Sequence, residues 1–180
     1  KFPDLKLVIA WNQPMLTFGK HYVFGLSVSK NHISIAPWSN DVIEKFTPKM
    51  YTGEWQGTMA LTEPDAGSSL SDLSTSAQPT EKEGIYLIKG QKIYISCGDH
   101  DGVDNIIHLM LARIGGAPAG TRGISLFVVP QKRLESNESN DVLTEGIYHK
   151  MGYKGAPIAH LMIGSNDQCE GYLVGEPNQG

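Results

Sequence analysis

The string ALTEPDAGSS, residues 60–69, combines residue types suited to binding a phosphorylated ligand. Pro64 fixes one backbone angle in a turn that follows a short apolar stretch. The residues after it are small, and Gly67 allows backbone conformations that other residues avoid. Backbone N–H groups and the hydroxyls of Ser68 and Ser69 can therefore converge on phosphate oxygens. An ordinary hairpin loop uses the same small residues, so turn chemistry is the competing interpretation.

A second string, GQKIYISCG at residues 90–98, could contact a flat heteroaromatic ligand. Tyr94, Ile95 and Ser96 alternate as in a strand, and they place an aromatic ring next to a hydroxyl group. Packing of Tyr94 in or on a sheet is the simpler explanation of this string taken alone. The string therefore does not identify a ligand without further information.

Other chemically capable groups are sparse. Asp99, His100 and Asp101 are metal-ligand types, but they follow Gly98 at an expected turn, and a zinc site needs more convergent donors. We interpret them as a solvated turn and expect no metal site. The two cysteines of the chain cannot form a disulfide framework or a multi-cysteine zinc site. No G-x-G-x-x-G or Walker string occurs, so Rossmann and P-loop folds are unsupported.

The elements that would position these strings are mostly strands. From residue 56 the hydrophobic period approaches 2, which predicts strands at 58–62, 73–77, 84–89, 92–96, 105–114, 124–129, 146–151, 158–163 and 171–174. Gly90 and Gln91 read as the two-residue loop of a hairpin. Such close spacing leaves no room for helical crossovers, so we predict an antiparallel sheet. Closure into a barrel would remove its exposed edges.

The first fifty residues differ from the rest, because they show no clean period of 3.6 or 2. A helix is predicted at residues 41–50, where Val42, Ile43 and Phe46 fall on one face. Pro48 should disturb the end of that helix. The predicted fold class is therefore mainly β, an antiparallel barrel preceded by a short, partly helical segment.

Composition excludes several classes of protein. The chain has 180 residues, 40% of them hydrophobic and 19% charged, which is neither disordered nor membrane composition. Its net charge of −4, without a basic cluster, argues against nucleic-acid binding. No apolar run approaches the ~20 residues of a membrane-spanning helix. The chain begins with Lys1 and ends in a loop-like string, so we expect a piece of a longer protein.

The two strings together resemble the middle domain of the acyl-CoA dehydrogenases. The similar pattern is L-T-E-P-x-A-G-S followed by G-x-K-x-aromatic-I-Ser/Thr, matched by LTEPDAGS and GQKIYIS. ARIGGAPAGTRGISLFVVP, YHKMGYKGAP and YLVGEPNQG resemble later segments of that domain, so the match covers about residues 50–180. GEWQGTM and GDHD resemble the branch that acts on 3-(methylthio)propanoyl-CoA.

This resemblance implies a fold and a cofactor. Residues 1–50 would be the remnant of an N-terminal helical domain, residues 51–180 the β-barrel, and the C-terminal helical domain would be absent. FAD would lie between the barrel and those C-terminal helices. The FAD-binding residues would be Met59, Leu61, Thr62, Gly67, Ser68, Tyr94, Ile95 and Ser96.

The resemblance also implies individual roles. The Leu61 N–H and the Thr62 hydroxyl would contact the pyrimidine edge of the flavin, and the Ser96 hydroxyl would face its N5. Ser68 would reach the phosphates of FAD and lie near the acyl-CoA thioester. Tyr94 takes the place of a frequent tryptophan beside the ring, and Ile95 packs there. Placement, hydrogen bonds to the ring edge and exclusion of water are what such a domain supplies.

Two positions depart from the family pattern, which often has Gly at Asp65 and Asp at Ser69. The catalytic base of the family is a glutamate that usually lies in the C-terminal helices, so this chain is expected to contain no catalytic residue. Glu63 belongs to the motif and is expected to be structural. The resemblance further implies a homo-oligomeric parent, an electron-transfer flavoprotein as acceptor, and a cytoplasmic or mitochondrial-matrix location.

Three hypotheses follow. The parent protein is an acyl-CoA dehydrogenase, an oxidoreductase, and the isolated chain is inactive because it lacks the base. Alternatively, it is an acyl-CoA oxidase or a flavin monooxygenase on the same scaffold. The third alternative is a β-barrel binding module without enzymatic activity, for which Asp65 and Ser69 are the support.

Overall fold

The computed structural model describes two compact units, residues 1–38 and 39–180. Side chains are described from residue 41 onward. The backbone is described for residues 5–10, 13–18, 21–29, 32–35 and 40–180. The boundary between the units precedes the helix, and it lies earlier in the chain than the division at residue 50 expected from the sequence.

The first unit contains four antiparallel strands paired in chain order. They are β1 (Leu5–Ala10), β2 (Gln13–Phe18), β3 (His21–Ser29) and β4 (His32–Ile35). β3 has the sequence HYVFGLSVS, whose β-branched and aromatic residues favour strands. All described residues of this unit are therefore in strands, and the helical content expected before residue 51 is confined to the helix of the second unit.

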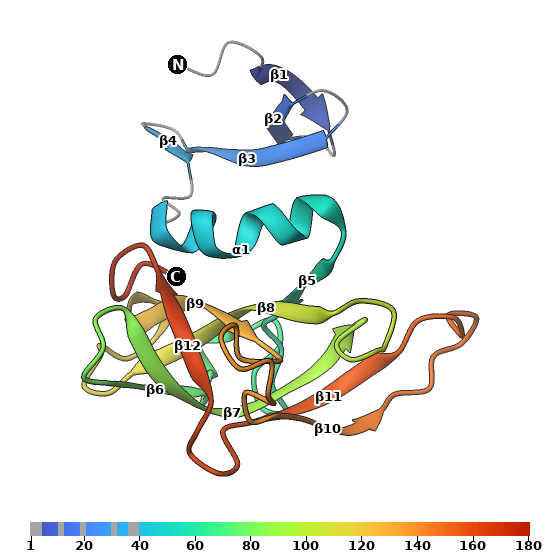
Figure 1. The fold of residues 1–180 in the computed structure, drawn as a ribbon. Helices are drawn as coiled ribbons and strands as arrows, with labels where there is room; N and C mark the ends of the chain where they lie inside the picture. Colours follow the sequence, from blue (N-terminus) through green and yellow to red (C-terminus); the bar gives the residue numbers. More distant parts are fainter. Residues whose placement is uncertain (1–4, 11–12, 19–20, 30–31, 36–39) are drawn as a thin grey trace. The chain divides into compact units, whose positions relative to one another are not determined.

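The second unit is mainly β, with one α-helix among its described residues (Figure 1). Its elements are α1 (Asn40–Thr52), β5 (Trp55–Ala60), the 3-10 turn Leu70–Asp72, β6 (Ser76–Pro79), β7 (Ile85–Ser96), β8 (Asn105–Ile114), the 3-10 turn Thr121–Gly123, β9 (Ile124–Pro130), β10 (Val142–Ile147), β11 (Ile158–Ile163) and β12 (Glu170–Val174). The strands predicted at 105–114 and 158–163 are confirmed without a shift at either end.

The strands of the second unit form a ring that includes β7. Their order is β10-β11-β7-β12-β9-β8-β5, and β6 pairs with both β7 and β8. The chain at the end of β5 reaches the second half of β7, where the Ile93 N–H donates to the Thr62 carbonyl at 2.9 Å. The first half of β7 pairs with β12, so β7 contributes to two sides of the ring.

Two pairings correct the prediction of an antiparallel sheet. β5 and β6 each run parallel to β8, whereas the other pairings of this sheet are antiparallel. A parallel pair needs a connection of a dozen or more residues, which is usually a helix. Here β6 and β7 lie within the connection between β5 and β8. Strand spacing therefore excluded a helical crossover but not a crossover made of strands.

The predicted hairpin at Gly90 and Gln91 is also wrong, because β7 continues through both residues as one strand. Gly90 is required for another reason. A Cβ atom at this position would lie 2.4 Å from Oγ1 and 2.8 Å from Cα of Thr75. The glycine thus marks a close approach of two backbones, which produces the same sequence signal as a turn.

Gly90→Ala is accordingly expected to destabilise the chain by about 2 kcal/mol, the usual scale of overpacking in a close-packed core. Gly146→Ala is the matched control, because a Cβ atom in this second strand position meets nothing within 4 Å. We expect the control to change the free energy of unfolding by less than about 0.5 kcal/mol. Equal losses in urea denaturation of the two variants would contradict this account of Gly90.

α1 covers the outer side of the ring (Figure 1). Val42 and Phe46, 5% and 2% exposed, pack against residues of β5, β8, β9 and β12. The Phe46 ring centroid lies 5.2 Å from that of Tyr172. The predicted helix is confirmed, but it continues through Pro48, because this packed face compensates for the hydrogen bond that proline cannot make. Within the described residues, no helix has the length and apolar character needed to cross a membrane.

Candidate functional site

The two strings identified in the sequence lie against each other in the structure. Beyond the end of β5, Thr62 accepts a hydrogen bond from the N–H of Ile93 in β7. Lys92 contacts the same string, because its Nζ atom donates to the Leu61 carbonyl at 3.2 Å. ALTEPDAGSS and GQKIYISCG thus form one junction, which we call the string junction.

A buried ion pair holds the string junction together. Nζ of Lys92 lies 2.8 Å from Oε1 of Glu63, and the side chains are 0% and 1% exposed. Glu63 also accepts hydrogen bonds from the N–H and hydroxyl of Ser74 and from the N–H of Thr75. Its carboxylate is therefore occupied within the fold, which agrees with a structural role for this residue.

The protonation of this pair follows from its surroundings. Burial raises the pKa of Glu63, but hydrogen bonds from Lys92, Thr75 and Ser74, and the charge of the ammonium, outweigh burial and lower this pKa from 4.5 to about 2. Burial lowers the pKa of Lys92, and Glu63 opposes that change. Glu63 is therefore ionised at neutral pH.

The loop that follows is compact on one side and open on the other. Glu63 and Ala66 exchange backbone hydrogen bonds of 2.8 and 3.2 Å, which leaves Pro64 and Asp65 at the exposed tip. The conformational freedom expected of Gly67 is not used, because its φ is not positive. A Cβ atom at this position would meet no atom of the chain within 4 Å. Gly67 therefore borders open space.

Hydroxyl groups at the string junction fall into two classes. Those of Ser69 and Ser71 lie 2.7 Å apart and bond to each other. Those of Thr62, Ser68 and Ser96 have no hydrogen-bond partner in the part of the chain that the structure describes, although nearby serines do. The three hydroxyls that the resemblance assigns to ligand contacts are thus the ones left available.

Tyr94 lies in the same string as Ser96 and presents an exposed aromatic ring. It lies at a bulge in β7 with φ +59°, in the left-handed region that non-glycine residues rarely adopt. Its side chain is 48% exposed. The ring packs on Tyr148, with centroids 4.3 Å apart, and Nζ of Lys150 lies 4.5 Å from its centroid. A strained backbone angle that is held in place by packing, as here, is typical of functional positions.

Three further residues assigned by the resemblance lie in different environments. Met59 is 57% exposed on β5, and Ser96 is exposed at the end of β7. Ile95 is only 2% exposed and packs in the apolar core inside the ring. The expected packing of Ile95 beside a ligand is therefore not supported, because strand alternation directs its side chain inward.

Sequence reasoning missed Lys92 and Arg113, two cations that shape the string junction. Arg113 on β8 donates from Nη1 to two carbonyls of the 115–123 loop at 2.8 and 3.0 Å, and from Nη2 to the Ser71 carbonyl at 3.1 Å. It thereby ties this loop to the turn that follows Ser68. A lone cation within an apolar strand was the available signal, because such a group needs partners when buried.

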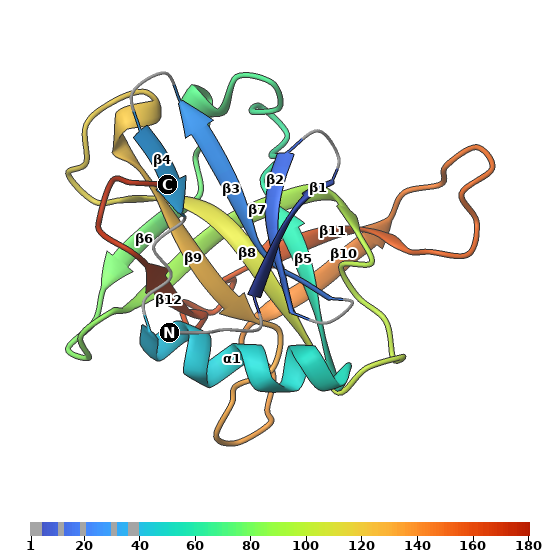
Figure 2. The ribbon, with the colours of Figure 1, turned by 90° about the horizontal axis from the view of Figure 1, so that it is seen from above.

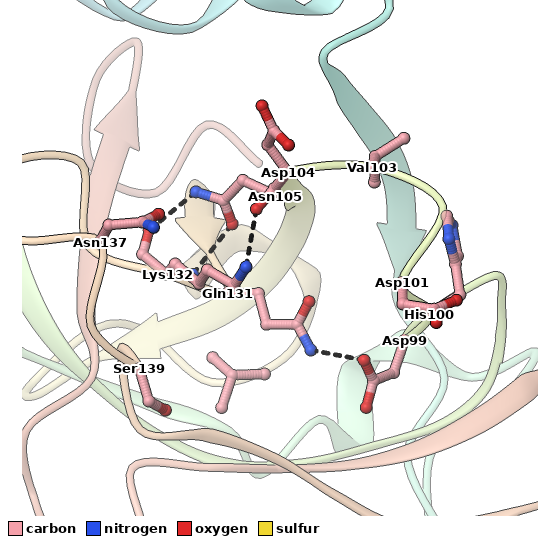
Figure 3. A pocket seen from close by; sticks show the side chains of 11 residues that line it. Asp99, His100, Asp101, Val103, Asp104, Asn105, Gln131, Lys132, Asn137 and Ser139 are labelled. Atoms are coloured by element: carbon pink, nitrogen blue, oxygen red, sulfur yellow. Dashed lines mark hydrogen bonds between the residues drawn. The ribbon is translucent and has the colours of Figure 1, made fainter.

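A cavity of about 760 Å³ lies beside the Asp-His-Asp segment (Figure 3). Asp99 accepts hydrogen bonds there from Gln131 Nε2 at 2.9 Å and from the Thr144 hydroxyl at 2.6 Å. His100 Nε2 lies 3.0 Å from Gln56 Oε1. Asp99 and His100 are therefore half-buried and hydrogen-bonded rather than solvated. Over the described residues, no three His, Cys, Asp or Glu side chains are placed to hold a metal ion.

One histidine is enclosed inside the ring. His108 on β8 is fully buried, and its Nδ1 lies 2.7 Å from the Thr58 hydroxyl. Its Nε2 has no hydrogen-bond partner. Burial lowers the pKa of His108 from 6.5 to about 4, and the charge of Asp99 opposes this only in part. The imidazole is therefore neutral at pH 7.

Comparison with known proteins relates this geometry to one family. The model for the acyl-CoA dehydrogenase middle domain matches residues 58–165. Butyryl-CoA dehydrogenase of Syntrophomonas wolfei is 49% identical over 142 residues, which cover 77% of this chain and 23% of that protein. 3-Methylmercaptopropionyl-CoA dehydrogenase of Ruegeria pomeroyi is 45% identical over 139 residues, which cover 75% and 23%. This chain thus spans 23% of the length of each relative.

A solved structure supports the same relationship. The crystal structure of an acyl-CoA dehydrogenase from Geobacillus kaustophilus matches with a TM-score of 0.64 and 30% identity. The match covers 79% of this chain and 34% of that one. The chain therefore belongs to the acyl-CoA dehydrogenase family and contains its middle domain.

Proposed function

We propose that the protein containing this chain is an FAD-dependent acyl-CoA dehydrogenase, and that the string junction is the middle domain's share of its flavin and thioester site. The observation that carries the proposal is the set of available hydroxyls of Thr62, Ser68 and Ser96. They lie on the two strings of a junction that is held by a buried ion pair and that carries the exposed Tyr94 ring. An exposed hydroxyl without a partner in the protein can donate a hydrogen bond to a bound ligand and accept one from it.

The fold proposal follows from the ring of strands. We infer that residues 51–180 form the closed β-barrel of this family and that α1 is the helical part of the preceding segment. Supporting this, β7 contributes to two sides of the ring, and the chain after β5 contacts its second half. Closure would leave fewer strand edges exposed to other chains.

The residues present fit a flavin in three respects. Open space next to Gly67 would admit phosphate groups, with the Ser68 hydroxyl as a donor. The Thr62 hydroxyl and the Leu61 N–H would hold the pyrimidine edge of the ring. Tyr94 would lie beside the flavin, with an orientation set by the bulge in β7. The exposed Asp65 does not occupy the open space.

A bound flavin would accept the hydride that leaves the β-carbon of the acyl group while a base removes the α-proton. The residues of this chain would orient the ring and the thioester and exclude water from one side. Glu63 cannot serve as that base, because its carboxylate is buried and paired. We place the base outside residues 1–180, and we propose a homo-oligomeric protein that passes electrons to an electron-transfer flavoprotein.

The test is a visible absorption spectrum of the full-length protein before and after anaerobic addition of acyl-CoA thioesters. We expect flavin bands that bleach with at least one thioester. Rapid formation of hydrogen peroxide by the reduced protein would contradict a dehydrogenase and favour an oxidase. Absence of flavin bands after addition of FAD would overturn the proposal in favour of a binding module.

Variants test the hydroxyls directly. Thr62→Ala and Ser96→Ala together are expected to weaken FAD binding by the full-length protein about 10- to 100-fold, because each removes one hydrogen bond to the ring. Thr80→Ala is the control, since that hydroxyl bonds to the Lys82 and Ile85 carbonyls elsewhere in the fold. Unchanged FAD affinity in the double variant, measured by fluorescence titration, would show that the hydroxyls do not contact flavin.

A further inference from the structure

The Asp-His-Asp segment lies on a loop that the proposed flavin site does not use. Residues 97–104, yellow-green in Figure 2, connect β7 to β8 and contain no helix or strand. The loop ends beside the start of β5, where the Asp104 N–H donates to the Glu54 carbonyl at 2.9 Å. Figure 3 shows Asp101 and His100 on this loop at the wall of the cavity of about 760 Å³. Asp101 is exposed and His100 is half-buried, so water reaches both residues.

Asp101 is followed by Gly102, and it is the only aspartate of the sequence that precedes a glycine. In such a pair the main-chain nitrogen of the glycine can attack the side-chain carboxyl carbon of the aspartate, which closes a five-membered succinimide ring. Because glycine has no Cβ atom, this attack is unhindered. In the described structure, no backbone N–H donates to the main-chain carbonyl of Asp101, and no salt bridge holds its carboxylate. Asp101 therefore keeps the freedom that ring closure needs.

The N–H of Gly102 points at a base. It donates to Nδ1 of His100 at 3.1 Å, so Nδ1 carries a lone pair and no proton. The ring proton therefore lies on Nε2, which donates to Oε1 of Gln56 at 3.0 Å. Nε2 of Gln56 donates to the Cys97 carbonyl at 3.5 Å, which leaves Oε1 free to accept. These hydrogen bonds hold a neutral imidazole with its basic nitrogen at the attacking nitrogen.

We propose that His100, Asp101 and Gly102 form a self-modification site at which Asp101 converts to isoaspartate, with His100 as the general base. The nitrogen of Gly102 bonds to Cγ of the protonated Asp101 carboxyl group while the N–H proton passes to Nδ1 of His100. The imidazolium returns this proton to the departing hydroxyl, and one water molecule leaves. Water then attacks the main-chain carbonyl carbon of the succinimide, its bond to the Gly102 nitrogen breaks, and the chain continues through Cγ.

This conversion alters the loop without changing the mass of the protein. The main chain gains one methylene group between residues 101 and 102, and the carboxylate moves to the position of the former main-chain carbonyl. The inference goes beyond the proposed function, because none of the three residues is assigned to flavin or thioester. Its success or failure is therefore independent of whether the full-length protein contains flavin.

The experiment follows isoaspartate in the full-length protein during prolonged incubation at pH 7 and physiological temperature. Trypsin releases residues 93–113 as one peptide, because a lysine precedes it and an arginine ends it. Electron-transfer fragmentation of this peptide in a mass spectrometer distinguishes isoaspartate from aspartate at each position. We expect isoaspartate to accumulate at Asp101 but not at Asp99 or Asp104, which serve as internal references. A sample taken before incubation gives the background.

A comparison of folded with unfolded protein separates assistance by His100 from the ordinary lability of an Asp-Gly pair. A fold usually slows this reaction, because it restrains the main chain. We expect the opposite here, with isoaspartate at Asp101 forming about 10-fold faster in the folded protein than in the same protein unfolded in urea, because only the fold holds the imidazole at the amide. An equal or slower rate in the folded protein would overturn the proposal, and this comparison needs no variant.

His100→Asn is the matched variant, because its side-chain oxygen can still accept from the Gly102 N–H but takes up no proton at pH 7. It should slow the reaction of the folded protein about 10-fold and leave the rate in urea nearly unchanged. His160→Asn is the control, since this half-buried histidine pairs with Gln91 on another part of the ring. Thermal unfolding confirms that both variants are folded. A wild-type rate in folded His100→Asn, or an equal loss in His160→Asn, would show that His100 is not the base.

Discussion

Lys92→Met is expected to lower the free energy of unfolding by about 3 to 5 kcal/mol, the usual loss when one partner of a buried ion pair is removed. The variant leaves the Glu63 carboxylate enclosed without its cation, although the remaining donors from Ser74 and Thr75 persist. A domain has only about 5 to 15 kcal/mol of stability in total, so the effect is large. Urea denaturation at pH 7, followed by tryptophan fluorescence, measures it.

The chain offers a matched control in a second Lys–carboxylate pair. Nζ of Lys89 lies 2.6 Å from Oδ1 of Asp167, but these side chains are 58% and 69% exposed. Lys89→Met should cost less than about 1 kcal/mol, because solvent screens the exposed pair. Adding Glu63→Gln to Lys92→Met should restore part of the loss, since it removes the uncompensated charge. Similar losses for the two single lysine variants would contradict our account of the string junction.

Acidification from pH 7 to pH 4 is expected to remove about 3 kcal/mol of stability through His108 alone. The folded-state pKa of this group is lowered to about 4, from an ordinary value of 6.5. As the pH falls through 6.5, His108 binds a proton in the unfolded chain, whereas the buried imidazole of the folded chain stays neutral. Stability is therefore present above pH 6.5 and is lost progressively down to pH 4.

His108→Gln tests this assignment, because an amide can still bond to Thr58 but does not titrate. The variant should show a flatter dependence of unfolding free energy on pH between 6.5 and 4, whatever its stability at pH 7. An unchanged slope in His108→Gln, measured by urea denaturation at several pH values, would show that another group is responsible.

A second acid transition should follow at lower pH. The folded-state pKa of Glu63 is about 2, against an ordinary value of 4.5. The unfolded chain then binds a proton first, so the stability contributed by the ion pair is lost as the pH falls from 4.5 towards 2. His108 and Glu63 therefore predict two successive losses of stability as the pH falls. Glu63→Gln should remove only the loss at the lower pH.

Local sequence patterns predicted individual elements well. The apolar runs that became β8 and β11 have turn residues at both ends, so their limits could be read directly. The Gly90 signal was misread, because a glycine that permits close backbone approach looks like a glycine in a turn. The parallel pairing of β5 with β8 was missed because strand partners far apart in the chain leave no local trace.

In the candidate site, too, the sequence indicated some features correctly and others not. Motif similarity indicated Thr62, Ser68, Tyr94 and Ser96, and all four side chains lie at least partly exposed at or beside the string junction. Ile95 was assigned with them, but its side chain is in the core. Alternation along β7 places Ile95 on the face opposite Tyr94 and Ser96, whereas motif similarity grouped the three residues together.

By itself, the sequence determined that this chain is rich in strands, resembles acyl-CoA dehydrogenases and carries two strings suited to a flavin. Local patterns suffice for these conclusions, because strand period and motif composition are properties of neighbouring residues. Only the tertiary structure decided that Glu63 and Lys92 pair in the interior and that β6 pairs with both β7 and β8. These features depend on contacts between distant segments, whose free energies arise from burial and charge in three dimensions.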